Sequence, residues 1–229
     1  MTNKRKLLVS ILISISSSVL ADGSTIDKVY HPYVQPLERE IEWRMITADG
    51  EQKHRLGLGK SFTEKLFVEV YLIGENKDDE DLSLSAYEIE TLWQLTEQGE
   101  YSADWGLLLE LEKERNENNW EFSTVLLVEK EWGRWVGTAN LYGIYEWGET
   151  IKNEFETALT LQTRYRYSRL LEPALEFYGG QDTKGLGPVL MGDVRFGIKK
   201  KLHWEAGAIF GLDSKTPDHT IRLMTEFEF

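Results

Sequence analysis

His219-Thr-Ile-Arg-Leu-Met-Thr-Glu-Phe-Glu-Phe229 is the last stretch of this 229-residue chain, and its pattern decides the fold. Apolar side chains, with one threonine, occupy the odd-numbered positions from 221 to 229, whereas charged side chains stand at 222, 226 and 228. Alternation with a period of two predicts a β-strand with one apolar face and one charged face. The strands of a parallel sheet that is covered on both sides are apolar on both faces, so that architecture is excluded.

This ending resembles the last strand of bacterial outer-membrane β-barrel proteins, which is amphipathic and finishes on Phe, as this chain does at Phe229. In that family the outer-membrane assembly machinery reads the final strand as an insertion signal. The resemblance therefore implies a closed barrel in the cell outer membrane of a Gram-negative bacterium. It also implies the barrel assembly machinery as a partner that recognises Phe229, but not what the barrel transports.

The same alternation runs through the chain from Arg39 onward. Most of the segments have the roughly 9 to 11 residues that a tilted transmembrane strand needs. We therefore predict an all-β fold, a closed antiparallel up-and-down transmembrane β-barrel of about twelve strands over residues 39–229. Ten strands are the alternative, because the second and fourth segments alternate weakly. The segments lie at about 39–47, 53–60, 65–74, 82–95, 105–112, 120–130, 135–147, 154–167, 172–179, 187–199, 201–212 and 219–229.

Two segments precede the barrel. Residues 1–21 have a basic start, a short apolar run and small residues up to Ala21, which predicts a cleaved secretory signal peptide. The run is too short for a transmembrane helix, which needs roughly 18 or more apolar residues. Residues 22–38 contain two prolines that prevent a regular ladder. We expect an extended periplasmic lead-in or a short strap that plugs the barrel, and the alternative is a solvated tether with no function of its own.

The lead-in carries a second resemblance. Val29-Tyr-His-Pro-Tyr-Val34, followed by Glu38, Glu40, Glu42 and Arg44, is similar to the opening of a group of proteobacterial outer-membrane barrel proteins. That group has no assigned activity. The similarity therefore agrees with the envelope location and adds nothing about function.

Composition excludes several classes of function. Without the expected signal peptide, 23 Lys and Arg residues stand against 39 Asp and Glu residues, which leaves a net charge of −16. Such acidity argues against nucleic acid as a partner. The absence of Cys excludes disulfides, thiolate metal sites and a lipid-modified N-terminal Cys.

The charged faces of the strands are expected to line the lumen, because the apolar faces meet lipid. Side chains of opposite charge on neighbouring strands can form ion-pair layers that fill a barrel, or they can line a narrow wet passage. Because acid outnumbers base, such a passage would favour cations. The candidate lumen residues are Glu40, Glu42, Arg44, Glu110, Glu112, Glu154, Glu156, Arg164, Arg166, Arg195, His203, Glu205, Arg222 and Glu226.

Aromatic side chains gather near both ends of the expected strands. Amphipathic rings prefer the headgroup level of a bilayer, so two aromatic girdles are expected. The alternative is that these rings belong to the core of a soluble β-sandwich or lipocalin-like barrel, and Trp43, in mid-strand, fits neither girdle. The girdle residues are Trp93, Trp105, Trp120, Trp135, Trp147, Trp204 and Phe229.

The connections give a further indication of orientation. With the N-terminus in the periplasm, the outside loops fall at about 48–52, 75–81, 114–119, 148–152, 180–186 and 213–218. The inside turns are mostly shorter, as at 131–133, 168–171 and 199–201. Long loops outside and short turns inside are typical of outer-membrane barrels.

No catalytic, metal or cofactor site is predicted. His31, His54, His203 and His219 are scattered without a convincing partner, and only His54 and His219 fall where an outer-membrane enzyme would need them, at the outer rim. The acidic run at 78–81 can hold calcium or meet lipopolysaccharide through divalent ions, but a solvated charge run is the usual explanation.

Three functions are therefore carried forward. The first is a narrow passive pore for small solutes or ions, in contact with outer-membrane lipid and lipopolysaccharide. The alternative is a filled structural or accessory barrel that binds an envelope partner through residues 22–38. An outer-membrane enzyme is the distant third. A pore predicts that conductance changes when a lumen pair such as Glu156 and Arg164 is neutralised.

Overall fold

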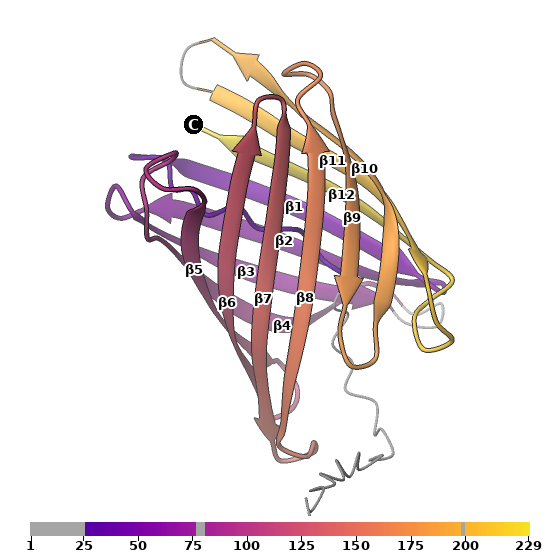
Figure 1. Cartoon of the computed structure of the whole chain (residues 1–229). Coiled ribbons are helices and arrows are strands. Elements are labelled where there is room, and N and C mark those ends of the chain that lie inside the picture. The colour runs from indigo at the N-terminus through magenta and orange to yellow at the C-terminus, as the bar shows by residue number, and fades with distance from the viewer. Residues whose placement is uncertain (1–25, 77–80, 198–199) are drawn as a thin grey trace, which may run out of the picture.

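The computed structural model describes residues 26–76, 81–197 and 200–229, which form one closed antiparallel barrel (Figure 1). The expected signal peptide lies outside the described residues. Twelve strands are present in the described part of the chain, so the prediction of twelve is confirmed and the alternative of ten is wrong. The strands are β1 (Arg39–Ala48), β2 (Glu51–Ser61), β3 (Leu66–Asn76), β4 (Ser83–Gln94), β5 (Asp104–Glu114), β6 (Asn119–Trp132), β7 (Trp135–Gly148), β8 (Glu154–Tyr165), β9 (Glu172–Gly179), β10 (Lys184–Phe196), β11 (Lys200–Gly211) and β12 (His219–Glu228).

Each strand pairs with its neighbours in the chain, and β12 closes the barrel by pairing with β1. In this seam Glu40 lies opposite Glu228, and Glu42 lies opposite Glu226. The N–H of Phe229 donates to the carbonyl of Arg39 at 2.9 Å, so the ladder continues to the last residue. The final stretch of the sequence is therefore the strand that seals the barrel.

The period-two pattern sorts side chains between the exterior and the lumen. On β1, Ile41 and Trp43 are 41% and 38% exposed, whereas Glu42 and Arg44, which alternate with them, are fully buried. A soluble sandwich or lipocalin-like barrel would hold its apolar residues inside, whereas here many large apolar side chains of the strands are exposed and the interior is mainly charged and polar, apart from two apolar patches. An apolar exterior around a polar interior is the arrangement of a membrane barrel. None of the described residues forms a helix that is long and apolar enough to cross a membrane.

The two ends of the barrel differ less than the sequence indicated. We call the end where β1 begins and β12 ends the terminal end, and we expect it to face the periplasm. Several of its turns are short, such as residues 133–134 between β6 and β7. However, the connection 95–103 between β4 and β5 also lies there, and it is longer than any connection at the opposite end. The expected asymmetry of long loops and short turns is therefore only partly observed.

Residues 26–38, called here the strap, run through the inside of the barrel (Figure 1). Ile26 lies near Gly185, which belongs to the start of β10 at the opposite end, and the strap leaves the lumen at Glu38 where β1 begins. The described part of the lead-in therefore lies inside the lumen, and its periplasmic placement stays a prediction. Its apolar side chains pack on two apolar patches of the lumen wall: Ile26 and Val29 on Tyr178, Val189, Met191 and Ile209, and Tyr30 on Leu108, Val125 and Leu127.

Candidate functional site

The strap is held by side chains of the barrel wall. The backbone of the wall strands pairs in the barrel's own ladder, so buried backbone groups of the strap need side-chain partners. Gln94 on β4 accepts the N–H of Val34 at 2.8 Å, and Tyr178 on β9 donates its hydroxyl to the carbonyl of Asp27 at 2.6 Å. Asn140 on β7 binds the backbone of Tyr30. These contacts fix the position of the strap along the barrel axis.

Charged contacts add to these bonds at the first residues of the strap. Arg44 on β1 donates to the carboxylate of Asp27, and the Nε of Arg55 on β2 lies 3.5 Å from the same carboxylate. The Nζ of Lys28 lies 2.5 Å from a carboxylate oxygen of Glu42. Hydrogen bonds between charged groups are roughly twice as strong as those between neutral groups. The start of the strap is therefore attached to the β1–β2 wall by ion pairs.

Arg222 on β12 links the strap to the other side of the lumen. It donates to the carbonyl of Asp27, and its Nη2 lies 2.8 Å from Glu205 and 3.0 Å from Glu176. Arg222 is fully buried, so its charge depends on these two carboxylates. His203 on β11 extends the network, with its Nε2 3.1 Å from Glu205. The middle of the lumen is thus filled by the strap and by a connected set of ion pairs.

Further along the strap, aromatic and histidine side chains reach the β4–β6 wall. The hydroxyl of Tyr30 donates to Glu90 at 2.7 Å, and Nδ1 of His31 lies 2.5 Å from Glu129. The hydroxyl of Tyr33 donates to Asp104 at 2.8 Å. Each of these contacts pairs a strap side chain with a carboxylate of the wall.

A cavity of about 420 Å³ remains between the strap and the wall, towards the terminal end of the lumen. Ten carboxylates line it, against five Lys and Arg residues and two histidines, so its lining is strongly acidic. A concave polar surface with excess negative charge attracts cations. The carboxylates belong to Glu38, Glu40, Glu69, Glu90, Glu129, Glu172, Asp193, Glu205, Glu226 and Glu228.

The predicted lumen residues all fall on inward-facing positions, but they do not form one group. Those near the strap, such as Glu42, Arg44 and Arg222, are buried in the central network. Glu154 is exposed at the opposite end, and Arg195 is exposed at the terminal end. Glu110, Glu112 and Glu156 are partly exposed on β5 and β8. Whether any of them contacts a transported solute stays a prediction.

The suggested pair of Glu156 and Arg164 does not form. Both residues lie on β8, towards its two different ends. Arg164 instead faces Glu172 at 3.5 Å and Glu129 at 3.9 Å. The neutralisation test therefore has to use other lumen residues.

The expected girdle residues point outward near the two ends of the strands. At the opposite end Trp120 and Trp147 stack, with ring centroids 6.3 Å apart. At the terminal end Trp135 packs against Tyr165 at 4.9 Å. Trp43 packs against His54 at 6.0 Å in mid-strand. Contact of these rings with lipid, and of Phe229 with the assembly machinery, stay predictions. The other expected girdle residues, Trp93, Trp105, Trp204 and Phe229, also lie on the outward register.

The four histidines show no catalytic arrangement in the described residues. His31 and His203 bind carboxylates, and Nε2 of His54 lies 3.5 Å from Gln52. No hydroxyl of Ser or Thr is bonded to a histidine in the part of the chain that the structure describes. Most of the acidic run at 78–81 lies outside the described residues.

Sequence reasoning offered a plugging strap as one alternative but named none of its residues among the lumen residues. The main contacts of the strap are made by Asp27, Lys28 and Tyr30. Its backbone forms hydrogen bonds with the side chains of Asn140 and Gln94. The signal was present in the apolar residues of the segment, which a solvated tether does not need. The lumen partners lie on strands distant in sequence, so no local pattern identified them.

No protein-family model matches the chain, and a search of curated proteins finds no match. Among solved structures the chain is similar to the KdgM porin, with a TM-score of 0.55 and 11% identity over 83% of this chain and 98% of that chain. It is also similar to the COG4313 outer membrane channel from Pseudomonas putida F1, with a TM-score of 0.57 and 14% identity over 89% and 100% of the two chains. The fold is that of an outer-membrane barrel. The barrel architecture that the sequence resemblance implied is thereby confirmed.

Proposed function

We propose that the chain is a passive outer-membrane channel for small solutes, that it prefers cations, and that the strap closes its lumen in this conformation. The observation that carries the proposal is the acid-lined cavity beside the strap. The strap continues into β1, but only non-covalent contacts hold it inside the lumen. Both similar structures are channels by name, which supports the same class of function for this chain.

The charge of the lumen supports cations rather than anions. Ten carboxylates against five Lys and Arg residues line the cavity, and several of those bases are already paired with acids. One KdgM structure holds a disordered oligogalacturonate, which is an acidic oligosaccharide. A lumen as acidic as this one would repel such a ligand. We therefore do not extend the ligand of that porin to this chain.

The way the strap is bound supports its role as a closure that can be released. Its backbone joins no wall strand in a ladder, so it can leave without breaking the barrel. A neutral hydrogen bond contributes roughly 0.5–1.5 kcal/mol, and one to a charged group roughly 1.5–3 kcal/mol. Each 1.4 kcal/mol changes an equilibrium about tenfold. Loss of two or three strap contacts would therefore shift the balance between closed and open states by orders of magnitude.

A reversible cross-link tests the proposal. A Cβ placed on Gly106 would lie 2.9 Å from the Cβ of Pro32, against about 3.8 Å in a disulfide. The two Cβ atoms have to move apart by about 0.9 Å, and the strap backbone has to shift as well because the added Cβ also lies 2.9 Å from the Cα of Pro32. The chain has no other Cys. We expect the oxidised P32C/G106C variant to be silent in a planar bilayer and to conduct after reduction. A variant that lacks residues 26–35 should conduct continuously, with a reversal potential in a salt gradient that shows cation preference.

The same recordings decide against the proposal if it is wrong. Insertion is checked separately by the difference in gel mobility between unheated and boiled samples. A variant without residues 26–35 that inserts but carries no current would exclude the channel. The second candidate, a filled accessory barrel, would then be favoured by the two apolar clusters inside the lumen, since apolar contacts of this kind obstruct a wet passage.

A further inference from the structure

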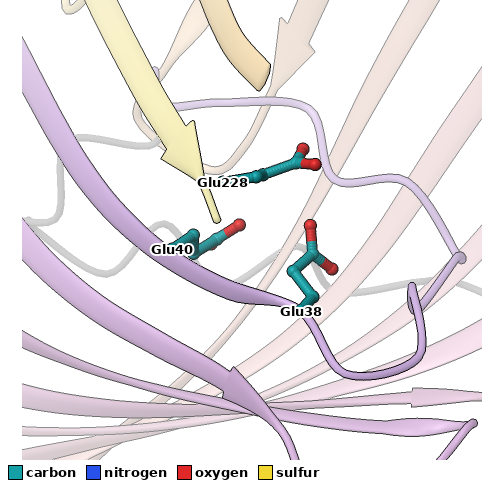
Figure 2. A group of neighbouring side chains, drawn as sticks. All are labelled: Glu38, Glu40 and Glu228. Carbon is teal, nitrogen blue, oxygen red and sulfur yellow. The ribbon is translucent and has the colours of Figure 1, made fainter. Parts of the chain in front are cut away.

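Three carboxylates meet where the strap, β1 and β12 come together at the terminal end. Glu38, Glu40 and Glu228 each place a carboxylate oxygen within 4.8 Å of the other two (Figure 2). Glu40 and Glu228 are partners in the register of the barrel seam. Glu38 is the last residue of the strap and β1 follows it directly, so the group joins the junction of the strap and β1 to β12.

The backbone around Glu38 is fixed in place. Leu37 has a φ of 65°, a left-handed conformation that turns the chain out of the lumen and into β1. The N–H of Ser61 on β2 donates to the carbonyl of Glu38 at 3.0 Å, and the N–H of Glu38 donates to the carbonyl of Gln35 at 3.3 Å. The carboxylate of Glu38 is thus held over the seam by a defined turn.

Glu40 provides a second, independent indication that the group binds a ligand. It is only 6% exposed, and its carboxylate has no hydrogen bond or ion pair with any residue that the structure describes. It lines the acidic cavity together with Glu69, which is 2% exposed and whose Oε1 has no hydrogen-bond partner in the described residues. Burying an unpaired carboxylate is costly unless a proton or a cation neutralises it.

The charges near this group favour a divalent cation. Lys201 on β11 forms an ion pair with Glu228, so three carboxylates and one ammonium leave a formal charge of −2. Glu226 adds further negative charge on β12.

A neighbouring group of acids is a poorer site. Glu40, Glu42 and Glu226 satisfy the same distance limit of 4.8 Å. However, Glu42 already faces Lys28 at 2.5 Å and Arg44 at 2.6 Å, so its charge is neutralised. Of the two groups, the one that contains Glu38 therefore keeps the larger excess of negative charge.

We propose that Glu38, Glu40 and Glu228 bind one Ca²⁺ ion at the seam of the barrel. Ca²⁺ binds oxygen at 2.3–2.6 Å, so two oxygens of one coordination shell lie at most about 5 Å apart, which this group satisfies. Ca²⁺ takes six to eight oxygens in flexible geometry, and water from the cavity completes the shell. Mg²⁺ requires a near-ideal octahedron of oxygens, so it should be bound more weakly by this group. The ion would tie the junction of the strap and β1 to the last strand.

Calorimetric titration of the folded full-length mature chain in detergent, after treatment with a chelator, tests the site. CaCl₂ should show one saturable event with a dissociation constant on the order of 10⁻⁴ M, and MgCl₂ should bind more weakly. E40Q should weaken Ca²⁺ binding at least about tenfold, which corresponds to 1.4 kcal/mol. K201Q should strengthen it, because the competing ammonium is removed, whereas a merely structural role predicts no such gain.

The matched control is E154Q, which removes one glutamate at the opposite end and should leave Ca²⁺ binding unchanged. If E40Q does not fold, E38Q replaces it, because Glu38 lies outside the strand ladder. Absence of saturable binding up to about 10 mM CaCl₂, well above the weakest protein Ca²⁺ sites, would overturn the proposal. Equal binding by the wild-type chain and both variants would overturn it as well. Since the readout is binding and not current, the outcome does not depend on whether the barrel is a channel.

Discussion

Tyr30 of the strap and Asn140 of β7 form a reciprocal pair of hydrogen bonds. The N–H of Tyr30 donates to Oδ1 of Asn140 at 2.8 Å, and Nδ2 of Asn140 donates to the carbonyl of Tyr30 at 2.9 Å. Asn140 is fully buried, and the hydroxyl of Thr160 donates to the same Oδ1 at 3.2 Å. One side chain thus satisfies both backbone groups of a strap residue, as a neighbouring strand would.

This pair leads to the first prediction. Asn140→Leu removes both bonds and leaves the N–H and carbonyl of Tyr30 buried without partners, at a cost of roughly 1–3 kcal/mol for each group. The strap should therefore leave its place more often, and the open fraction in single-channel recordings should rise at least about tenfold. Asn153→Leu, in an exposed connection, serves as the control. An open fraction equal to that of the control would show that this pair does not hold the strap closed.

Asp27 gives a second prediction. Its carboxylate faces the positive groups of Arg44 and Arg55, which keep one fewer partner in Asp27→Asn. We expect more frequent opening with an unchanged reversal potential in a salt gradient, because Asp27 leaves the lumen with the strap in the open state of both the wild type and the variant. Asp218→Asn, outside the lumen, should change neither quantity. An open fraction of Asp27→Asn equal to that of Asp218→Asn would contradict the prediction.

The strands were predictable from the sequence because a barrel wall has two different environments. Ile41 and Trp43 face the exterior, and Glu42 and Arg44 face the lumen. Each strand is therefore recognisable from a local period of two in its own sequence. The closing strand was predictable for the same reason. These features need no knowledge of which strands face each other across the lumen.

The position of the strap was not predictable in this way. Its apolar residues Ile26, Val29 and Tyr30 have neither the period of a strand nor that of a helix, and their contacts depend on the shape of the lumen. Its partner Asn140 lies 110 residues further along the chain. The false pair of Glu156 and Arg164 has the same cause, since charge composition does not specify contacts across a barrel.

A third prediction concerns the mouth of the barrel at the opposite end. Glu154 and Glu156 face the lumen there, and neither forms an ion pair with a described residue. Replacing both by Gln removes two negative charges without leaving a buried cation unpaired. We expect a weaker cation preference of the open channel, measured as a smaller reversal potential, with little change in resistance to urea. Cation preference equal to that of the wild type would place the selective part of the lumen elsewhere.

The fourth prediction tests how tightly the lumen is packed. A Cβ on Gly57, which faces the lumen from β2, would clash with Oε1 of Glu69 and lie 2.6 Å from the ring of Tyr71. A Cβ on Gly143, which faces outward from β7, would meet Phe155 at an ordinary 3.4 Å. Gly57→Ala has to displace two buried side chains that also contact Lys28 and Glu42 through hydrogen bonds or charge, and overpacking of this kind costs roughly 1–3 kcal/mol. Unfolding in urea, followed by gel mobility without boiling, should therefore begin at lower urea for Gly57→Ala than for Gly143→Ala. Equal urea midpoints of the two variants would mean that the lumen is loosely packed at Gly57, because Glu69 and Tyr71 could then move aside without a cost in stability.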